Sequence, residues 1–460
     1  MEVVARTIGV SVPVLRFLIS FAATIPCGWV WRFMPGPTAR HAYAAFSGAH
    51  LSYFAFGMRA NLLFSFLMIV GYGSMLLHRR SCGLVTFVAA FAFLISCHVH
   101  FMSGEAWKEG GIDCTGALMV LTLKVVSCSI NYQDGLLKEE GLREAQKRNR
   151  LLHIPSPLAY IGYCLCFGTH FAGPVYEIRD YIDWTEETGL WSISSQKPPP
   201  APYWGTIAAL ARTILCMGVY LFLSRHVPLA LIFESQFKTW PLWRRWAYVC
   251  LCGFTARWKY YFIWSMSEAC MIVAGLGFSG WSNKDPSKPK WDRARNVDIL
   301  AVELAGSAGE LPLHWNIHVS TWLRFYVYER LISRGKKPGF LQLLATQVVS
   351  AVWHGLYAGY LLFFINSAIM IAGSRVIYKW QRAIPESWGL IRRAGWFIHF
   401  LYTSLVLNYA CIGFLVLTTR ETLEAYNRLY YAGTILPIAI TALGYVIHPP
   451  RPVTSRSKRD

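Results

Sequence analysis

The sequence predicts an all-α protein that crosses a membrane many times. Of its 460 residues, 54% are hydrophobic and only 15% are charged. Its mean hydropathy of +0.34 is high for a soluble enzyme. Apolar runs of about 20 residues, the length that crosses a bilayer, recur along the chain. Backbone hydrogen bonds cannot stay open in lipid, and the alternating pattern of a β-barrel is missing, so the predicted spans are helices.

The apolar runs define the membrane elements in chain order. The first run, 8–31, is longer than the apolar part of a typical secretory signal and is followed by similar runs, so we expect it to stay in the membrane. Seven further runs are clear: 62–77, 82–101, 117–130, 158–175, 206–223, 396–417 and 430–447. Two longer stretches, 246–281 and 340–371, must tilt strongly, break or pass twice. This counting predicts about ten or eleven membrane helices.

The charges indicate how the loops face the membrane. The net charge is +19. Most of it is expected in Lys and Arg that flank spans on the cytosolic side, and the rest in contacts with an anionic substrate or lipid headgroups. The basic loops 79–80 and 138–150 are then cytosolic, and the acidic loop 177–197 lies opposite, if 158–175 crosses once. Because the basic residues form no continuous domain, we expect no nucleic-acid binding.

The chain is predicted to be organised as one unit. We expect a single polytopic membrane domain over residues 1–448 and a short basic cytosolic tail over 449–460. The chain has 12 cysteines, but none forms a C-x-x-C pair, so we predict no metal site. It contains neither a G-x-S-x-G nucleophile elbow nor a Walker phosphate-binding loop, which argues against the enzyme classes built on those motifs.

A polar stripe interrupts the segment 313–331. Polar groups in a membrane segment are costly, so they are functional candidates by default. Four of them recur at every fourth position and share one helix face: Asn316, Ser320, Arg324 and Tyr328. This pattern suits a helix that turns its polar face toward a wet cavity. The alternative is an interfacial helix anchored by Trp315 and Trp322.

A histidine stands in the apolar segment 350–364. His354 follows Trp353, and it is either a hydrogen-bonded core histidine or a general base. An imidazole, with a reference pKa of about 6.5, is well suited to take the proton of an attacking alcohol. Gly355 and Gly359 form a G-x-x-x-G pattern that places both on one helix face. They either pack a helix seam or border a slot for an acyl chain.

A third polar group lies in the first of the two long apolar stretches. Arg257, Lys259 and Tyr260 occur together there, and Glu268 follows inside the apolar run. Glu268 is expected to pair with a nearby Arg or Lys. The charged loop 289–298 suits a structural role and a substrate contact equally well.

Together, the asparagine and the histidine resemble the membrane-bound O-acyltransferase superfamily. That family has an Asn in a W-N context and, downstream, a His in a W-H-G context, here Trp315-Asn316 and Trp353-His354-Gly355. Further segments are similar to its lysophospholipid acyltransferase branch, above all the plant lysophosphatidylcholine type: KYYFIW (259–264), WDRARNVD (291–298) and residues 103–125. The resemblance extends over nearly the whole chain. One departure is Ala358, where the family often has Pro.

The resemblance implies a helical bundle around a catalytic chamber, embedded in the lipids of the endoplasmic reticulum membrane. It implies transfer of a fatty acyl group from acyl-CoA to the free hydroxyl of a lysophospholipid, with acyl-CoA as a substrate and no separate cofactor. His354 would be the base, and Asn316 would either orient it or donate to the oxyanion. Nine further residues are expected to contact the substrates: Trp315, Trp353, Arg257, Lys259, Tyr260, Arg324, Tyr328, Gly355 and Gly359.

Two other functions stay open at this point. One is an enzyme of the same family that acts on a sterol, a diacylglycerol or a protein, because pocket shape decides the acceptor. The other is a transporter in which His354, Glu268 and Arg324 line a conduction path. Paired broken segments in matching halves of the chain would favour a transporter, and the sequence shows none. The sequence leaves the oligomeric state open.

Overall fold

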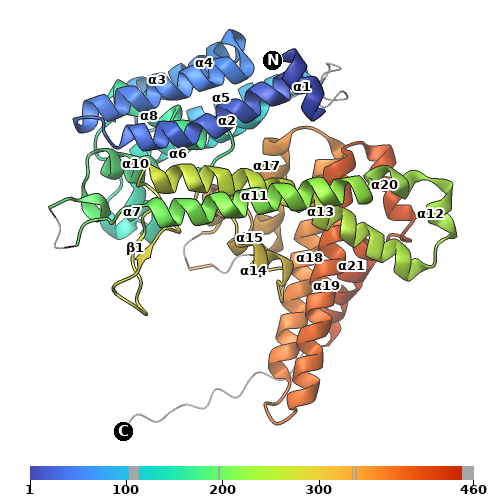
Figure 1. The fold of residues 1–460 in the computed structure, drawn as a ribbon. Helices are drawn as coiled ribbons and strands as arrows, with labels where there is room; N and C mark the ends of the chain where they lie inside the picture. Colours follow the sequence, from blue (N-terminus) through green and yellow to red (C-terminus); the bar gives the residue numbers. More distant parts are fainter. Residues whose placement is uncertain (103–112, 195–196, 334, 337–338, 448–460) are drawn as a thin grey trace, which may run out of the picture.

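Helices form almost all of the regular structure (Figure 1). The structure is a computed structural model, and it describes residues 1–102, 113–194, 197–333, 335–336 and 339–447. Among these residues the strands are β1 (Gly280–Trp281) and β2 (Pro289–Lys290), which pair antiparallel. The predicted all-α class is therefore confirmed. The predicted tail, 449–460, lies outside the described residues, and the extent of the single domain stays a prediction.

The first part of the chain is a series of helices in which each packs against the next. They are α1 (Glu2–Ile8), α2 (Val12–Trp31), α3 (Gly36–Phe56), α4 (Met58–Leu77), α5 (Cys82–Met102) and α6 (Thr115–Asp134). The Ser11 hydroxyl caps α2 by accepting the N–H of Val14 at 3.4 Å. A single residue, Gly57, joins α3 to α4. Its φ of 84° is disfavoured for residues that have a side chain, which explains the glycine at this position.

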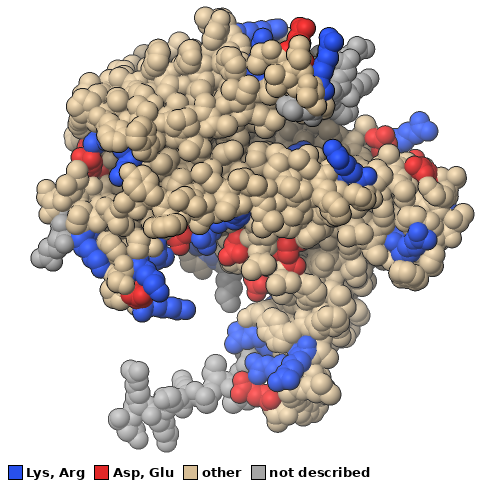
Figure 2. Space-filling view, viewed as in Figure 1, with Lys and Arg blue, Asp and Glu red and all other residues tan. Residues whose placement is uncertain are grey.

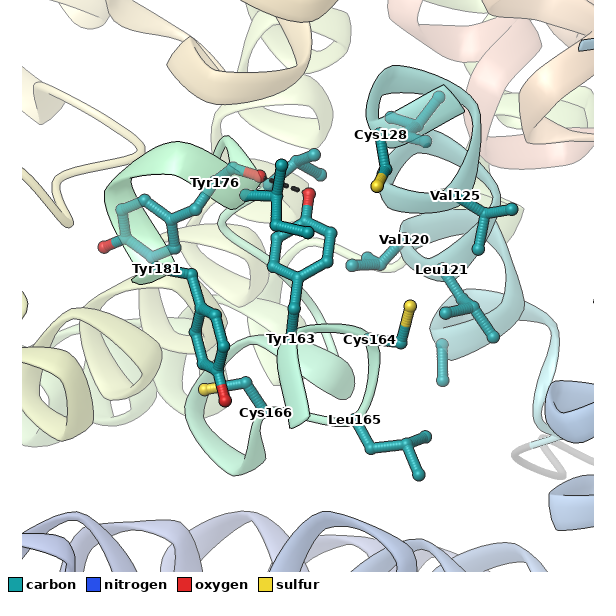
Figure 3. Close-up of a cluster of buried hydrophobic side chains, with 14 of the residues drawn as sticks. Val120, Leu121, Val125, Cys128, Tyr163, Cys164, Leu165, Cys166, Tyr176 and Tyr181 are labelled. Carbon is teal, nitrogen blue, oxygen red and sulfur yellow. Dashed lines mark hydrogen bonds between the residues drawn. The ribbon is translucent and has the colours of Figure 1, made fainter. Parts of the chain in front are cut away.

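The apolar run 158–175, predicted to cross the membrane once, turns back inside the fold. It forms α8 (Pro157–Cys164) and α9 (Phe167–His170), which are too short to span a bilayer. Lys124, buried in α6, donates from Nζ to the carbonyl oxygen of Tyr163 over 3.0 Å. This bond gives the carbonyl group at the end of α8 a closer donor than the Cys166 N–H, which lies 3.5 Å away. Figure 3 shows Tyr163 and its neighbours packed against α6.

This turn changes the side on which the next loop lies. In α10 (Ile178–Thr185), Asp180 pairs with Arg148 across 3.2 Å between its Oδ1 and the arginine Nη2. The basic loop 138–150 and the acidic loop 177–197 are therefore on the same side. The prediction that they lie on opposite sides is wrong, because the segment between them does not cross.

From Tyr203 onward, the described residues form seven helices of nine or more residues. They are α11 (Tyr203–His226), α13 (Leu242–Val273), α17 (Phe340–His354), α18 (Ala358–Ala383), α19 (Gly389–Val416), α20 (Thr419–Asn427) and α21 (Ala432–Val446). Short helices lie between them or precede them: α7 (Glu144–Asn149), α12 (Ser235–Thr239), α14 (Ile299–Glu303), α15 (Leu311–His314) and α16 (Ile317–Leu323). Helices α11 and α13 lie side by side, while α18, α19 and α21 extend together away from the rest of the fold (Figure 1).

The multi-pass membrane class is confirmed, but the number of spans is lower than predicted. In the described ranges, seven helices are long and apolar enough to cross a membrane, or eight if the pair α20 and α21, bent by 74°, is one span. The predicted ten or eleven included the run of α8 and α9, which is too short, and α13, which carries Arg257, Lys259 and Glu268. Figure 2 shows a face on which residues that are neither basic nor acidic predominate, as expected for a chain in lipid.

The two long apolar stretches have different structures. Residues 246–273 belong to one continuous helix, α13, which is 32 residues long. The stretch 340–371 breaks between α17 and α18, so the predicted break occurs in the second stretch only. Gly355 ends α17 with a φ of 129°. Only glycine adopts this conformation readily, which explains why glycine follows His354.

Candidate active site

One cavity of about 390 Å³ lies among α13, α16, α17, α18 and α19, and both His354 and Asn316 line it. Apolar side chains form much of its wall, among them Val319, Leu343 and Phe364. A pocket of this kind, apolar with a few converging polar groups, is the usual form of a small-molecule site. The two residues predicted to be catalytic are thus brought to one chamber by segments 38 positions apart (354 − 316).

His354 is held by its own helix. Its Nδ1 lies 2.8 Å from the carbonyl oxygen of Ser350, one turn earlier in α17. Because a carbonyl oxygen only accepts, Nδ1 carries the hydrogen, and in the neutral ring Nε2 carries the lone pair. The rings of Trp353, Phe364 and Phe414 surround the imidazole with centroids 4.6, 5.0 and 5.3 Å away. The arrangement suits a neutral imidazole that accepts a proton at Nε2.

The turn that follows His354 is fixed from α5. His98 Nε2 donates to the carbonyl oxygen of Trp353 over 3.1 Å, and Trp353 Nε1 donates to the Met119 carbonyl oxygen over 2.9 Å. Trp353 is therefore a buried anchor behind the site. Ala358 is the first residue of α18, a position where proline also fits because its missing N–H has no helical partner there. Alanine in place of the family's usual proline therefore keeps the break between α17 and α18.

Asn316 sits at the start of α16 in a left-handed conformation, with φ 45° and ψ 53°. Asparagine tolerates this conformation better than most residues. Its Oδ1 accepts a hydrogen bond from Nδ2 of Asn296 over 3.0 Å. No hydrogen bond among the described residues joins Asn316 to His354. The orientation of the imidazole thus comes from Ser350, which leaves the amide of Asn316 for another role.

The predicted polar stripe does face the cavity. Its four members all line the cavity wall: Asn316, Ser320, Arg324 and Tyr328. After α16 the helix widens into a π-helical turn, Arg324–Tyr328. The wider turn keeps every fourth residue on one face, and such turns are frequent at functional sites.

The π-helical turn is anchored on its far side by a buried carboxyl group. Tyr326 Oη lies 2.7 Å from Oε2 of Glu177, which also accepts from Nδ2 of Asn131 at 2.9 Å. Burial raises the pKa of Glu177 to about 7, and the hydrogen bonds from Tyr326 and Asn131 act against that rise. These contacts tie the cavity-lining helix to α6.

The predicted basic contacts divide into two kinds. Arg257 lines the cavity, but its Nε and Nη2 donate to the carboxylate of Glu303 at 2.7 and 2.6 Å, and its Nη1 donates to Asn408 Oδ1 at 2.8 Å. Its charge is thus already paired. Lys259 is exposed on α13 and is not part of the cavity wall. Arg375 of α18, which the sequence did not single out, does line the cavity and is exposed.

The structure separates the eleven predicted site residues into two groups. Seven line the cavity: Asn316, His354, Trp315, Arg257, Tyr260, Arg324 and Tyr328. Four do not: Trp353, Lys259, Gly355 and Gly359. The two glycines also fail to share a helix face, because Gly355 lies in the break before α18. The roles of all eleven in catalysis and substrate binding stay predictions.

Gly359 packs against the end of α19. Its N–H donates to the carbonyl oxygen of Leu417 over 2.8 Å. A Cβ at this position would lie 2.8 Å from Leu417 Cα, which is too close for a backbone contact. Of the two roles considered for Gly359, the geometry favours the packing of a helix seam.

Two other polar segments have structural roles. Glu268 accepts from Nη2 of Arg212 over 2.5 Å, as predicted for a carboxylate in an apolar run. The loop 289–298 runs beside the start of the stripe, where Val297 pairs with Trp315 in an isolated antiparallel bridge. Sequence reasoning missed Asn296 in that loop, and the only signal was an amide within a charged segment. Among the described residues, no group of three or more His, Cys, Asp or Glu side chains is arranged to hold a metal ion.

Comparisons with known proteins agree with this geometry. A sequence profile of the membrane-bound O-acyltransferase family matches residues 99–412. Over its full length the chain is 58% identical to Lysophospholipid acyltransferase 1 of Arabidopsis thaliana and 56% identical to Lysophospholipid acyltransferase 2 of the same plant, covering 99% of each relative. It is 29% identical to the Lysophospholipid acyltransferase of Schizosaccharomyces pombe, over 94% of this chain and 86% of the relative. The chain, with its histidine and asparagine on one cavity, belongs to the membrane-bound O-acyltransferase family.

Proposed function

We propose that this chain is an acyl-CoA-dependent lysophospholipid acyltransferase of the endoplasmic reticulum membrane, acting in phospholipid remodelling. The observation that carries the proposal is the meeting of His354 Nε2 and the Asn316 amide on one largely apolar cavity. The names of the relatives, identical at more than half of all positions, supply the substrate class. The location in the endoplasmic reticulum is inferred from the family resemblance.

The chemistry follows from the two side chains. The acceptor hydroxyl attacks the thioester carbonyl carbon while His354 Nε2 takes its proton, a form of catalysis worth about 10²–10⁴-fold. The carbonyl oxygen becomes an oxyanion that the Asn316 amide N–H stabilises. The intermediate then collapses: the carbon–sulfur bond breaks, the thiolate of CoA leaves, and the imidazolium returns the proton to it. Because the thioester is already activated, the scheme requires no resident cofactor.

The cavity offers suitable groups for both substrates. Arg324 and Arg375 lie on its wall with Gln347, and guanidinium groups bind phosphate well. Among the described residues Arg324 pairs through Nε alone, with Glu329 Oε1 at 2.8 Å, whereas Arg257 uses Nε and both Nη groups. We therefore assign the phosphates of acyl-CoA to Arg375 and to the Nη groups of Arg324 in preference to Arg257. Apolar side chains of the wall then face the acyl chains of the donor and of the lysophospholipid. Which acceptor is used depends on the shape of this wall.

The test uses purified protein in detergent with acyl-CoA and a panel of acceptors. With lysophosphatidylcholine we expect equal amounts of released CoA thiol and new phosphatidylcholine. A diacylglycerol, a sterol and a peptide serve as competing acceptors and are expected to give no product. Product from one of these and none from any lysophospholipid would contradict the proposed acceptor. Absence of CoA release with every acceptor would contradict acyl transfer itself.

A further inference from the structure

Asn296 makes three hydrogen bonds to the turn that carries Asn316, and it is only 1% exposed. Its backbone carbonyl oxygen accepts the N–H of Ile317 at 2.9 Å. Its Oδ1 accepts the N–H of His318 at 3.0 Å. Its Nδ2 donates to Oδ1 of Asn316 at 3.0 Å. One buried side chain thus contacts both the capping end of α16 and the amide of Asn316.

These bonds determine which way both amides point. The backbone N–H of His318 can only donate, so the atom of Asn296 facing it must be the amide oxygen. The other end of Asn296 is then the NH₂ group, which can only donate. The atom of Asn316 that faces this group must accordingly be Oδ1. With its oxygen held in this way, Asn316 has its NH₂ group left to act as a donor at the cavity.

Asn296 is itself held in place by the surrounding backbone. The next residue, Val297, pairs with Trp315, and Asp298 N–H donates to the carbonyl oxygen of His314 at 2.9 Å. On the other side, His318 Nε2 lies 3.0 Å from the Arg293 carbonyl oxygen. The loop and the start of α16 therefore form one paired unit, which holds Asn296 beside Asn316.

We propose that Asn296 is a positioning residue that turns the amide of Asn316 so that its N–H, and not its oxygen, faces the thioester carbonyl. The inference rests on the proposed function, since it concerns the oxyanion formed from the acyl donor. Asn296 contacts no reacting atom, and it acts only through Asn316. It also resolves the two roles considered for Asn316, because an amide whose oxygen is held by Asn296 is an oxyanion donor.

The decisive variant is Asn296→Asp. A carboxylate has nearly the same shape and still accepts from His318 N–H, but it cannot donate to Asn316 Oδ1. Repulsion between the two oxygens turns the Asn316 amide over, so its NH₂ group faces the carboxylate and its oxygen faces the substrate. We expect kcat to fall by about 10²-fold, the typical effect of losing one oxyanion donor. The KM values for both substrates should change less than about threefold, because the cavity wall is kept.

A double-variant cycle separates positioning from a structural role. In an Asn316→Ala background, Asn296→Asp should reduce kcat no further, because the amide that it orients is already gone. Asn316→Asp, which keeps the bond from Asn296 but has no N–H to donate, should match the kcat of Asn296→Asp. If the Asp variant does not accumulate, Asn296→Ala replaces it. That variant frees the amide to adopt both orientations, and about a tenfold loss of kcat is expected in the wild-type background and none in the Asn316→Ala background.

Each outcome is assigned in advance. Unchanged kcat in Asn296→Asp, or an equal further loss in the Asn316→Ala background, overturns the positioning role. The oxyanion arises from the donor whatever the acceptor, so these assays use whichever acceptor the wild-type protein prefers. A wild-type protein that transfers to a different acceptor class therefore contradicts the proposed function and leaves this test decisive. A wild-type protein that transfers to none overturns both.

Discussion

Two broken apolar segments of this protein solve the same physical problem in different ways. Each break, between α8 and α9 and between α17 and α18, leaves backbone carbonyl groups open in a membrane-embedded fold, where they must find donors. At the first break, Lys124 supplies its three N–H donors to Tyr163 O, Cys164 O and Thr169 Oγ1. The first break is thus sealed by a side chain that has no donor left.

At the second break, two histidines bond the backbone carbonyl groups, and one of them keeps a ring nitrogen available at the cavity. His98 donates to the Trp353 carbonyl oxygen, and His354 uses only Nδ1 to hold the Ser350 carbonyl oxygen. Among the described residues no hydrogen bond is made to His354 Nε2, and the residue lines the cavity. The comparison teaches that an ionisable residue in a broken span is structural when all of its polar atoms are paired. It is a catalytic candidate when one of them faces a cavity.

The largest expected effect is at the second break. His354→Ala should abolish acyl transfer, because no other His, Asp or Glu among the described residues lines the cavity, while the protein still accumulates in membranes. The measurement is product formation by purified protein at equal amounts. His50→Ala is the matched control, since His50 is exposed on α3 and should keep normal activity. Near-normal turnover of His354→Ala would remove this residue from the mechanism.

A substitution at the first break should lower the stability of the protein. Lys124→Met leaves Cys164 O and Thr169 Oγ1 without this donor and leaves Tyr163 O with only the Cys166 N–H at 3.5 Å. A buried acceptor that loses its donor costs about 1–3 kcal/mol, so we expect a loss of at least ~2 kcal/mol. Melting in detergent measures it. Lys259→Met is the matched control, because Lys259 is exposed and the same substitution there should leave melting unchanged. An Lys124→Met protein that melts normally but has lost activity would show that the first break is also functional.

Part of this difference could be predicted from the sequence. The cavity could be located from short sequence patterns, because each pattern involves residues close together in the chain. These patterns are Trp315-Asn316, Trp353-His354-Gly355 and the polar residue at every fourth position. The turn at α8 and α9 could not be predicted, because it depends on a lysine 39 residues from its partner. For the same reason the sequence suggested a substrate contact for Arg257. Its partners Glu303 and Asn408 are 46 and 151 residues away.

A smaller effect is expected where the second break packs against α19. Gly359→Ala places a Cβ 2.8 Å from Leu417 Cα, so the backbone must shift, and we expect a loss of about 1–3 kcal/mol of stability. Turnover of short and long acyl-CoAs should fall by the same factor. A donor-length series together with melting tests this. Selective loss of long donors with unchanged melting would instead place Gly359 beside the acyl chain.

The smallest expected effect concerns charge at the cavity. By the same rule, replacing an arginine whose N–H groups are already paired should lower the stability of the protein. Replacing one that faces the cavity should weaken substrate binding. Arg375→Gln should therefore raise the KM for acyl-CoA by about tenfold or less, since one charge-assisted contact to phosphate is worth ~1 kcal/mol at an exposed site. The KM for the lysophospholipid should stay unchanged. Arg257→Gln is the matched contrast, because it leaves the Glu303 carboxylate without its partner and should lower melting with equal effects on both substrates. If Arg257→Gln alone raises the KM for acyl-CoA and Arg375→Gln changes nothing, the rule fails, and the sequence-based prediction that Arg257 contacts a substrate is supported.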